Sequence, residues 1–202
     1  MKKIFCIFSV LLITACQTYP LDLIVIPEAK ENLNFPNLEL KFEPNKTTSK
    51  SNSIFEVDVK QNTNHLSLFY REFEKNVITS EGEKKGSIIL TPIYQTVKVN
   101  MGWMGLSGAG LFIPNILGMP ISSYTSSCKL DLKIEDKYKT LIKVYNSTST
   151  VTRYAAAYWG YYFEDGTNAA IYDCYKETLN DLIQQMNNDR NFIAEKLSKQ
   201  EF

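Results

Sequence analysis

The side chains that most often perform catalysis are few in this chain and stand apart from one another. Among 202 residues there is one histidine, His65, and a Ser-His-acid triad would have to be built around it. Ser107 stands in a glycine-rich run, but the nucleophile elbow of serine hydrolases needs glycine two residues after the serine, where this chain has Ala109. We interpret His65 as a surface residue of a helix, and we expect no catalytic residues and no enzymatic activity.

Carboxylates, cysteines and glycines give no second chemical site. Glu164 and Asp165 directly precede Gly166, which is typical of a solvated turn with favourable charge at the start of a helix. One histidine and four cysteines include no metal-ligand spacing. The glycines of residues 105–110 lack the Lys-Ser or Lys-Thr of a phosphate-binding loop. We therefore expect no metal and no cofactor.

The first sixteen residues have the order of a secretory signal. Lys2 and Lys3 precede the apolar run Ile4 to Ile13, which is about half as long as the roughly 20 residues that a membrane-spanning helix needs. The segment ends in Ile13-Thr14-Ala15-Cys16, which resembles the lipobox of bacterial lipoproteins. We therefore expect residues 1–15 to be removed as a signal peptide. The alternative is an ordinary secreted protein whose signal happens to end near a cysteine.

The resemblance implies that Cys16 is lipidated and becomes the first residue of the mature chain. Because two or more acyl chains anchor a protein stably, it also implies a firm membrane anchor that carries palmitate-type chains. By the sorting habit of Gram-negative lipoproteins, Gln17 in place of Asp implies the outer membrane, with the protein on its periplasmic face.

The 187 residues that remain are enough for one domain with a core. Removal of Lys2 and Lys3 with the signal leaves 20 basic against 22 acidic side chains, a formal charge of −2, and no basic run with interleaved aromatics occurs. We therefore expect no nucleic-acid partner.

Scattered prolines and a polar run predict that residues 16–53 form the lipidated N-terminus and a tether, although Asn37 to Glu43 alternates like a half-buried strand. Residues 54–202 are then the periplasmic domain.

Hydrophobic periodicity predicts a two-layer α+β domain. Two amphipathic helices are expected on one face of an antiparallel or mixed sheet of four to five strands, in the order strand, helix, three strands, helix. The expected strands are 54–60, 87–100, 126–135 and 140–153, and the expected helices are 65–77 and 167–186, the latter continued by 192–197. The short charged turn at 136–139 predicts that the last two strands form an antiparallel hairpin.

Two cysteines remain after Cys6 leaves with the signal and Cys16 takes the lipid. Cys128 begins an alternation whose apolar side points inward, and Cys174 shares a stripe of the last helix with apolar residues. Because export permits disulfides, we expect a bond between Cys128 and Cys174. The alternative is a pair of buried free thiols.

The order of elements, taken with the lipobox, resembles the small periplasmic domain of the lipopolysaccharide-assembly lipoprotein that plugs an outer-membrane barrel, and of other auxiliary lipoproteins of envelope transport. This resemblance implies a non-enzymatic scaffold or accessory subunit of an envelope assembly or transport complex, with an envelope protein as its partner. No residue motif is shared, so the resemblance carries over no site residue.

Residues 99–128 contain no charged side chain, and Met101 to Ile121 is mainly apolar. Five glycines and two prolines oppose a membrane-spanning helix there, although that interpretation stays open. The others are a loop that folds back over the core, and an apolar excursion that contacts a membrane or a partner. In the last case the contacts would be Trp103, Met104, Leu106, Leu111, Phe112 and Ile116.

Aromatic side chains crowd the ten residues before the last helix. Four of them are candidates for binding a ligand by stacking on a sugar or at a lipid interface, namely Tyr158, Trp159, Tyr161 and Tyr162. The alternative is that most of them cap the sheet and the end of the core. If they bind, the function is that of an envelope glycan- or lipid-binding module.

Overall fold

The computed structural model describes residues 33–43, 56–57, 64–79, 82–156, 160 and 163–198. They form an α+β arrangement, as the periodicity predicts. The elements in chain order are β1 (Leu38–Phe42), β2 (Glu56–Val57), α2 (Asn64–Asn76), β3 (Gly86–Asn100), α3 (Gly102–Ala109), α4 (Ile113–Ile116), β4 (Ser122–Asp136), β5 (Leu141–Ala155), α5 (Phe163–Asn188) and α6 (Arg190–Ser198).

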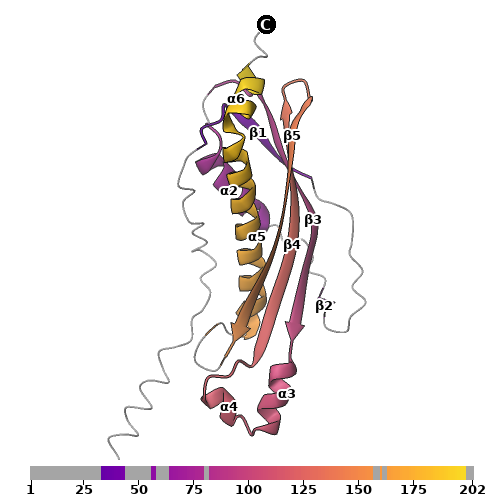
Figure 1. Ribbon diagram of the computed structural model, residues 1–202, viewed down its shortest axis with the longest axis vertical. Helices are drawn as coiled ribbons and strands as arrows, with labels where there is room; N and C mark the ends of the chain where they lie inside the picture. Colours follow the sequence, from indigo (N-terminus) through magenta and orange to yellow (C-terminus); the bar gives the residue numbers. More distant parts are fainter. Residues whose placement is uncertain are drawn as a thin grey trace, which may run out of the picture.

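Three strands of 15 residues each dominate the sheet, whose strand order is β1-β3-β4-β5. The β3–β4 and β4–β5 pairs are antiparallel, β1 runs parallel to β3, and β2 pairs with β3 near its end. At about 3.3 Å per residue, strands of this length make a sheet roughly 50 Å long. The molecule is therefore an elongated rod, with α6 at one end and the β3–β4 connection at the other (Figure 1).

Both long helices cover the same face of this sheet, and α5 lies along it from end to end (Figure 1). The inward residues of β4 alternate as the sequence predicts, and Cys128, Leu130, Leu132 and Ile134 have no exposed surface. The predicted stripe of α5, Ile171, Cys174, Thr178, Leu182 and Met186, is buried against them. The apolar faces of the strands and of the helix thus meet in one core, which is completed by Phe69 and Phe73 of α2 and by Val77 directly after it.

The expected start of the domain at residue 54 is wrong. Leu33, Phe35 and Leu38 are all at most 2% exposed and belong to the same core as the helices. The backbone amide of Leu33 donates to the carbonyl of Asn76 at 2.9 Å, and β1 pairs along the first residues of β3. Residues 33–42 therefore belong to the domain and not to a tether.

The structure joins Cys128 of β4 to Cys174 of α5 in a disulfide, with their Cα atoms 6.2 Å apart. Both residues are fully buried, and Val151 of β5 packs beside them. The bond fastens the middle of the long helix to the middle of the sheet.

Asp189, in the turn between α5 and α6, ties the helices to β5. Its Oδ2 atom accepts a hydrogen bond from the Tyr145 hydroxyl at 2.9 Å and lies 3.1 Å from Lys143 Nζ. The hydrogen bond from Lys143, and then that from Tyr145, lower the pKa of Asp189. Burial, and then the same carboxylate, raise the pKa of Tyr145.

Candidate interaction surface

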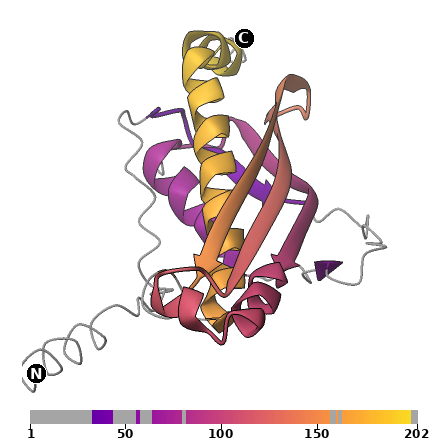
Figure 2. The same ribbon diagram turned by 60° about the horizontal axis from the view of Figure 1, so that its bottom comes forward.

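The connection between β3 and β4 forms a small helical hairpin at one end of the rod, built from α3, a tight turn and α4 (Figures 1 and 2). We call residues 101–121 the apolar tip. Its large apolar side chains project outward, and eight of them are at least 40% exposed: Met101, Met104, Leu106, Leu111, Phe112, Ile113, Ile116 and Leu117.

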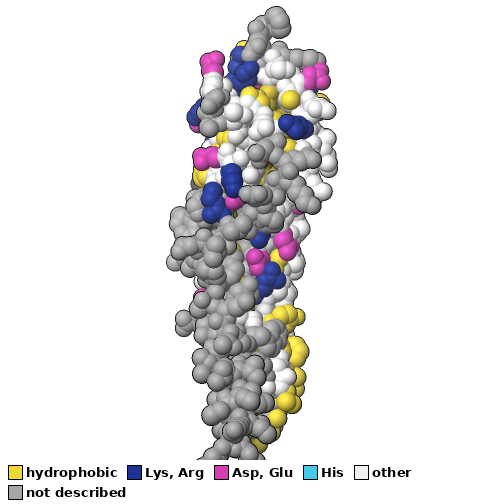
Figure 3. All heavy atoms as spheres, turned by 90° about the vertical axis from the view of Figure 1, so that its left-hand side faces the viewer, with side chains coloured by type: hydrophobic (Ala, Val, Ile, Leu, Met, Phe, Trp, Pro, Cys, Tyr) yellow, Lys and Arg dark blue, Asp and Glu magenta, His cyan; other side chains and the backbone are white. Residues whose placement is uncertain are grey.

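The exposure of the apolar tip is extreme for residues of this type. Leu111 is 79% exposed and Leu117 is 82% exposed. In Figure 3 the described side chains at the lower end of the molecule are hydrophobic, whereas the basic and acidic ones lie further up. A soluble surface seldom gathers so many apolar side chains in one place unless that place contacts something else.

The polar side chains of the apolar tip are turned inward and serve its own backbone. Ser107 is fully buried, and its hydroxyl donates to the carbonyl of Trp103 at 2.7 Å. Asn115 is also buried, and its Nδ2 atom donates to the carbonyl of Met119 at 3.1 Å. At the start of α3, Oδ1 of Asn100 accepts from the amide of Gly102 at 2.8 Å. These bonds fix the fold of the hairpin and leave an outer surface that is almost purely apolar.

The apex of the apolar tip has an uncommon backbone. Leu111 and Phe112 both have left-handed conformations, with φ of 49° and 62°. For a bulky L-residue this conformation costs roughly 1–2 kcal/mol. The amide of Phe112 donates to the carbonyl of Ser107 at 2.7 Å, which helps to hold the strained turn. The turn joins α3 to α4 at the end of the rod and carries two large side chains (Figure 1). Strain of this kind is found mostly where a backbone serves a function.

The residues predicted as contacts in this stretch fall in the apolar tip. Met104, Leu106, Leu111, Phe112 and Ile116 are exposed there, and Trp103 is half-buried on α3. The interpretation as a loop folded back over the core is wrong, because these side chains point away from it. No helix in the described part of the chain is long and apolar enough to cross a membrane.

The prediction did not include Ile113 and Leu117, which are 57% and 82% exposed. Their apolar character and the lack of charge around them were the available signals. The direction in which each side chain points depends on the turn at 110–112, which no hydrophobic periodicity in the sequence predicts.

The other candidate residues lie outside the description or take no part in the apolar tip. Cys16 and the aromatic candidates Tyr158, Trp159, Tyr161 and Tyr162 fall outside the described residues. His65 belongs to α2.

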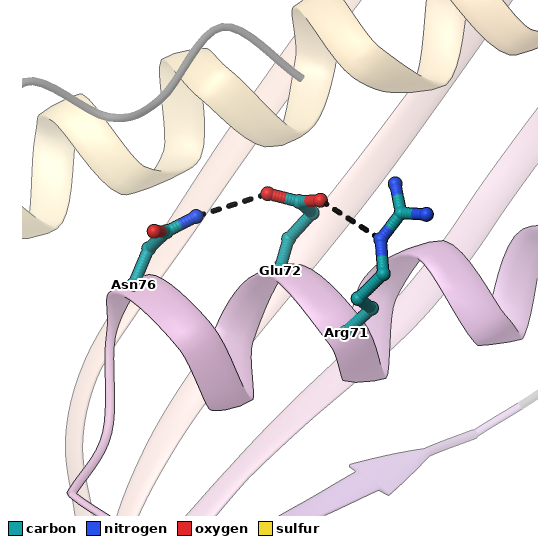
Figure 4. Close-up of polar contacts among 3 residues, drawn as sticks. All are labelled: Arg71, Glu72 and Asn76. Carbon is teal, nitrogen blue, oxygen red and sulfur yellow. Dashed lines mark hydrogen bonds and ion pairs between the residues drawn. The ribbon is translucent and has the colours of Figure 1, made fainter. Parts of the chain in front are cut away.

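A buried polar cluster on α2 is the strongest rival for a chemical site (Figure 4). Glu72 is only 5% exposed, and its two carboxylate oxygens accept from Nδ2 of Asn76 at 2.9 Å and from Nε of Arg71 at 3.2 Å. Each oxygen thus has a partner, and the half-exposed Arg71 balances the charge. We interpret the cluster as structural. Among the described residues, no group of three His, Cys, Asp or Glu could hold a metal ion.

Comparison with known proteins gives little to add to this geometry. No protein-family model matches the chain, and no curated protein matches it. A solved structure described as a minor lipoprotein from Acinetobacter baumannii is similar to it, with 12% identity and a TM-score of 0.33. That match covers 78% of this chain and 94% of the other.

Proposed function

We propose that this protein is a lipid-anchored, non-enzymatic scaffold or accessory component of an envelope assembly, placed on the periplasmic face of the outer membrane. It is held to its membrane through Cys16 and attaches to a second component through the apolar tip. Its function is to hold the components of the assembly in position, and it catalyses no reaction.

The lipobox-like sequence Ile13-Thr14-Ala15-Cys16 supports the first attachment. One acyl chain alone binds a membrane only marginally, whereas several acyl chains on one cysteine anchor a protein stably. The chain from Cys16 onward then stays at the membrane surface and needs only one further contact to be fixed in orientation.

The single observation that carries the second attachment is the exposure of the apolar tip. Eight large apolar side chains lie within residues 101–117, inside a stretch from 99 to 128 that has no charge. At the other end of the same sheet the exposed Tyr138 and Leu141 stand beside charged side chains, Lys137 and Lys139 of the β4–β5 turn. Exposed apolar side chains are therefore mixed with charge at one end of the rod and are free of charge at the other.

Site-specific photo-crosslinking in the producing bacterium tests both attachments. A photoreactive residue replaces Leu111, which is 79% exposed, in the full-length lipidated chain. The matched control places it at Tyr138, which is 68% exposed at the opposite end of the sheet. We expect position 111 to give an adduct with a protein or with a lipid and position 138 to give none, and we expect labelled palmitate in the wild-type chain but not in Cys16→Ser.

The proposal fails if palmitate labels neither chain, or if positions 111 and 138 give the same adducts. It also fails if position 111 gives no adduct in intact cells.

A further inference from the structure

The apolar tip has properties that select between the two kinds of surface that could receive it, a protein and a lipid bilayer. We propose that it inserts into the surface of a lipid bilayer. This inference rests on the proposed function, since it names the second component that the apolar tip attaches to.

The outer surface of the apolar tip offers almost no group that a protein partner could recognise by polar contact. A protein–protein interface carries about one hydrogen bond per 100–200 Å² and a polar rim around its apolar centre. In residues 101–121 the only polar side chains are Trp103, Ser107 and Asn115, and the last two are buried and bonded to the backbone of the apolar tip. A bilayer asks for no hydrogen bonds and accepts such a surface as it is.

The backbone of the apolar tip is also suited to an apolar medium. A lipid-exposed segment must satisfy its amide and carbonyl groups internally. The turn between α3 and α4 does so to a large extent: the amides of Gly110, Phe112 and Ile113 donate to carbonyls of the apolar tip at 2.7–3.0 Å. Helices this short cannot cross a bilayer, and shallow insertion of about 5–10 Å at the boundary of headgroups and acyl chains is the depth that suits them.

The side chains at the apex are placed to enter first. Leu111 and Phe112 hold the left-handed turn that joins α3 to α4 at the end of the rod, whereas Trp103 is the second residue of α3, close to the end of β3 (Figure 2). Tryptophan prefers the level of the headgroups, where its ring can be partly in lipid and partly in water. Trp103 is half-buried, which agrees with a place at the base of an inserted segment.

The length of the chain allows the anchor and the apolar tip to share one membrane. Leu33 lies beside the end of α2 and β1 pairs along the first residues of β3, so the described chain begins at the end of the sheet opposite the apolar tip. The 15 residues of β3 alone account for roughly 50 Å of that distance, and the apolar tip extends it further. Residues 17–32 reach at most about 55 Å when extended. The anchor and the apolar tip can therefore both reach one bilayer, with the rod inclined over it.

Binding to vesicles tests the proposal. The protein is the chain from residue 16 with Cys16→Ser, which keeps the whole described core between residues 33 and 197. Trp159→Phe leaves Trp103 as the only tryptophan of the two in the sequence. We expect it to sediment with vesicles of phosphatidylcholine, and we expect brominated phosphatidylcholine to quench Trp103.

The variants are matched in side-chain type and exposure. Leu111→Asn with Phe112→Asn removes two apolar side chains, and Asn tolerates the left-handed backbone at both positions. We expect it to bind at least about 100-fold more weakly, given the usual free energy of burying two such side chains. The control, Tyr138→Asn with Leu141→Asn, removes side chains that are 68% and 53% exposed at the other end of the sheet, and should bind like the parent. High salt should change little, because residues 99–128 carry no charge.

The proposal is overturned if the parent protein neither sediments with the vesicles nor shows quenching of Trp103. Equal losses in the two double variants would overturn it as well. Thermal unfolding of both variants shows that each is folded before binding is measured. If vesicles fail to bind while position 111 still crosslinks to a protein in cells, the lipid proposal falls and the proposed function stands.

Discussion

Opening the Cys128–Cys174 disulfide should cost the fold about 4 kcal/mol. The bond closes a loop with a sequence separation of 46 residues. In the chain-entropy model, a loop of that length restricts the unfolded chain by roughly 4 kcal/mol at 25 °C.

Changes in the folded state on reduction should alter this free energy little. Both sulfur atoms lie in a site with no exposed surface, and the reduced thiols would keep nearly the same volume there. The hydroxyl of Thr178 lies 3.1 Å from the sulfur of Cys128 and remains available to it. Reduction should therefore act mainly on the unfolded chain, by returning its freedom.

Urea unfolding with and without a reductant measures the effect on one and the same chain. Cys16→Ser in the chain from residue 16 leaves Cys128 and Cys174 as its only cysteines. With a slope of about 2 kcal/mol per molar urea, the midpoint should fall by about 2 M on reduction. Cys128→Ala with Cys174→Ala serves as the control, because reductant should no longer move its midpoint.

A fall of less than about 0.5 M would refute the reasoning, since it corresponds to no more than about 1 kcal/mol. Two free thiols in the native chain, counted before any reductant is added, would refute the bond itself.

Three further predictions concern the rod that carries the apolar tip. Gly166→Ala should lower the free energy of unfolding by about 1–3 kcal/mol, because the new Cβ atom would overlap the ring of the fully buried Tyr124. Gly105→Ala in α3 should raise the free energy of unfolding by about 0.5–1 kcal/mol, because its Cβ atom would meet no other atom within 4 Å. Urea unfolding of the two variants measures both changes. Burial raises the pKa of Tyr175 from 10.0 to about 12, so its contribution to stability is complete below pH 10 and is lost as the pH rises towards 12. Tyr175→Phe should make alkaline unfolding between these values less steep. Hydrogen bonds from a lysine and a tyrosine of β5 lower the pKa of Asp189 below 3.8, so its contribution is present above that pH and is lost as the pH falls through the lowered pKa. Asp189→Asn should make acid unfolding less steep, and equal pH profiles for the variant and the parent would contradict this.

The elements with a strong local pattern were predictable because one face of each is buried. β4 alternates strictly from Cys128 to Ile134, and the structure buries those residues without exception. The stripe of α5 and the break near Asp189 follow from helical spacing and from the polar residues around the break. Because side chains repeat with a fixed period along a strand or a helix, the buried face of such an element can be recognised from its own residues alone.

The part that was missed depends on pairing at a distance. Residues 38–42 alternate as a strand, but nothing local says that they join β3, more than 40 residues later, as a parallel neighbour. Pro36 and the polar residues after Glu43 favoured a tether, and burial of Leu33 and Phe35 by α2 overrides that preference. Local propensity is a weak guide wherever tertiary contacts decide.

The apolar tip was predictable as a composition but not as a shape. The lack of charge between 99 and 128 was visible in the sequence, and so was the chance that it marks a contact surface. Its short helices and its left-handed apex were not visible, because Leu111 and Phe112 are among the residues least expected at positive φ. Gly110 stands next to them and could take that conformation at no cost, yet it does not.

The two connections of the same long sheet make the strongest case that the apolar tip has a task. β4 and β5 are joined by residues 137–140, which are mostly charged or polar and form a tight turn. β3 and β4 are also antiparallel neighbours, so a turn of that size would serve them equally well. Instead, the connection between β3 and β4 consists of residues 101–121, exposes Leu111 and Leu117 to water, and has a strained apex. Topology requires none of these features and each one lowers the stability or solubility of the free protein, so their combination is best explained by a surface that receives the apolar tip.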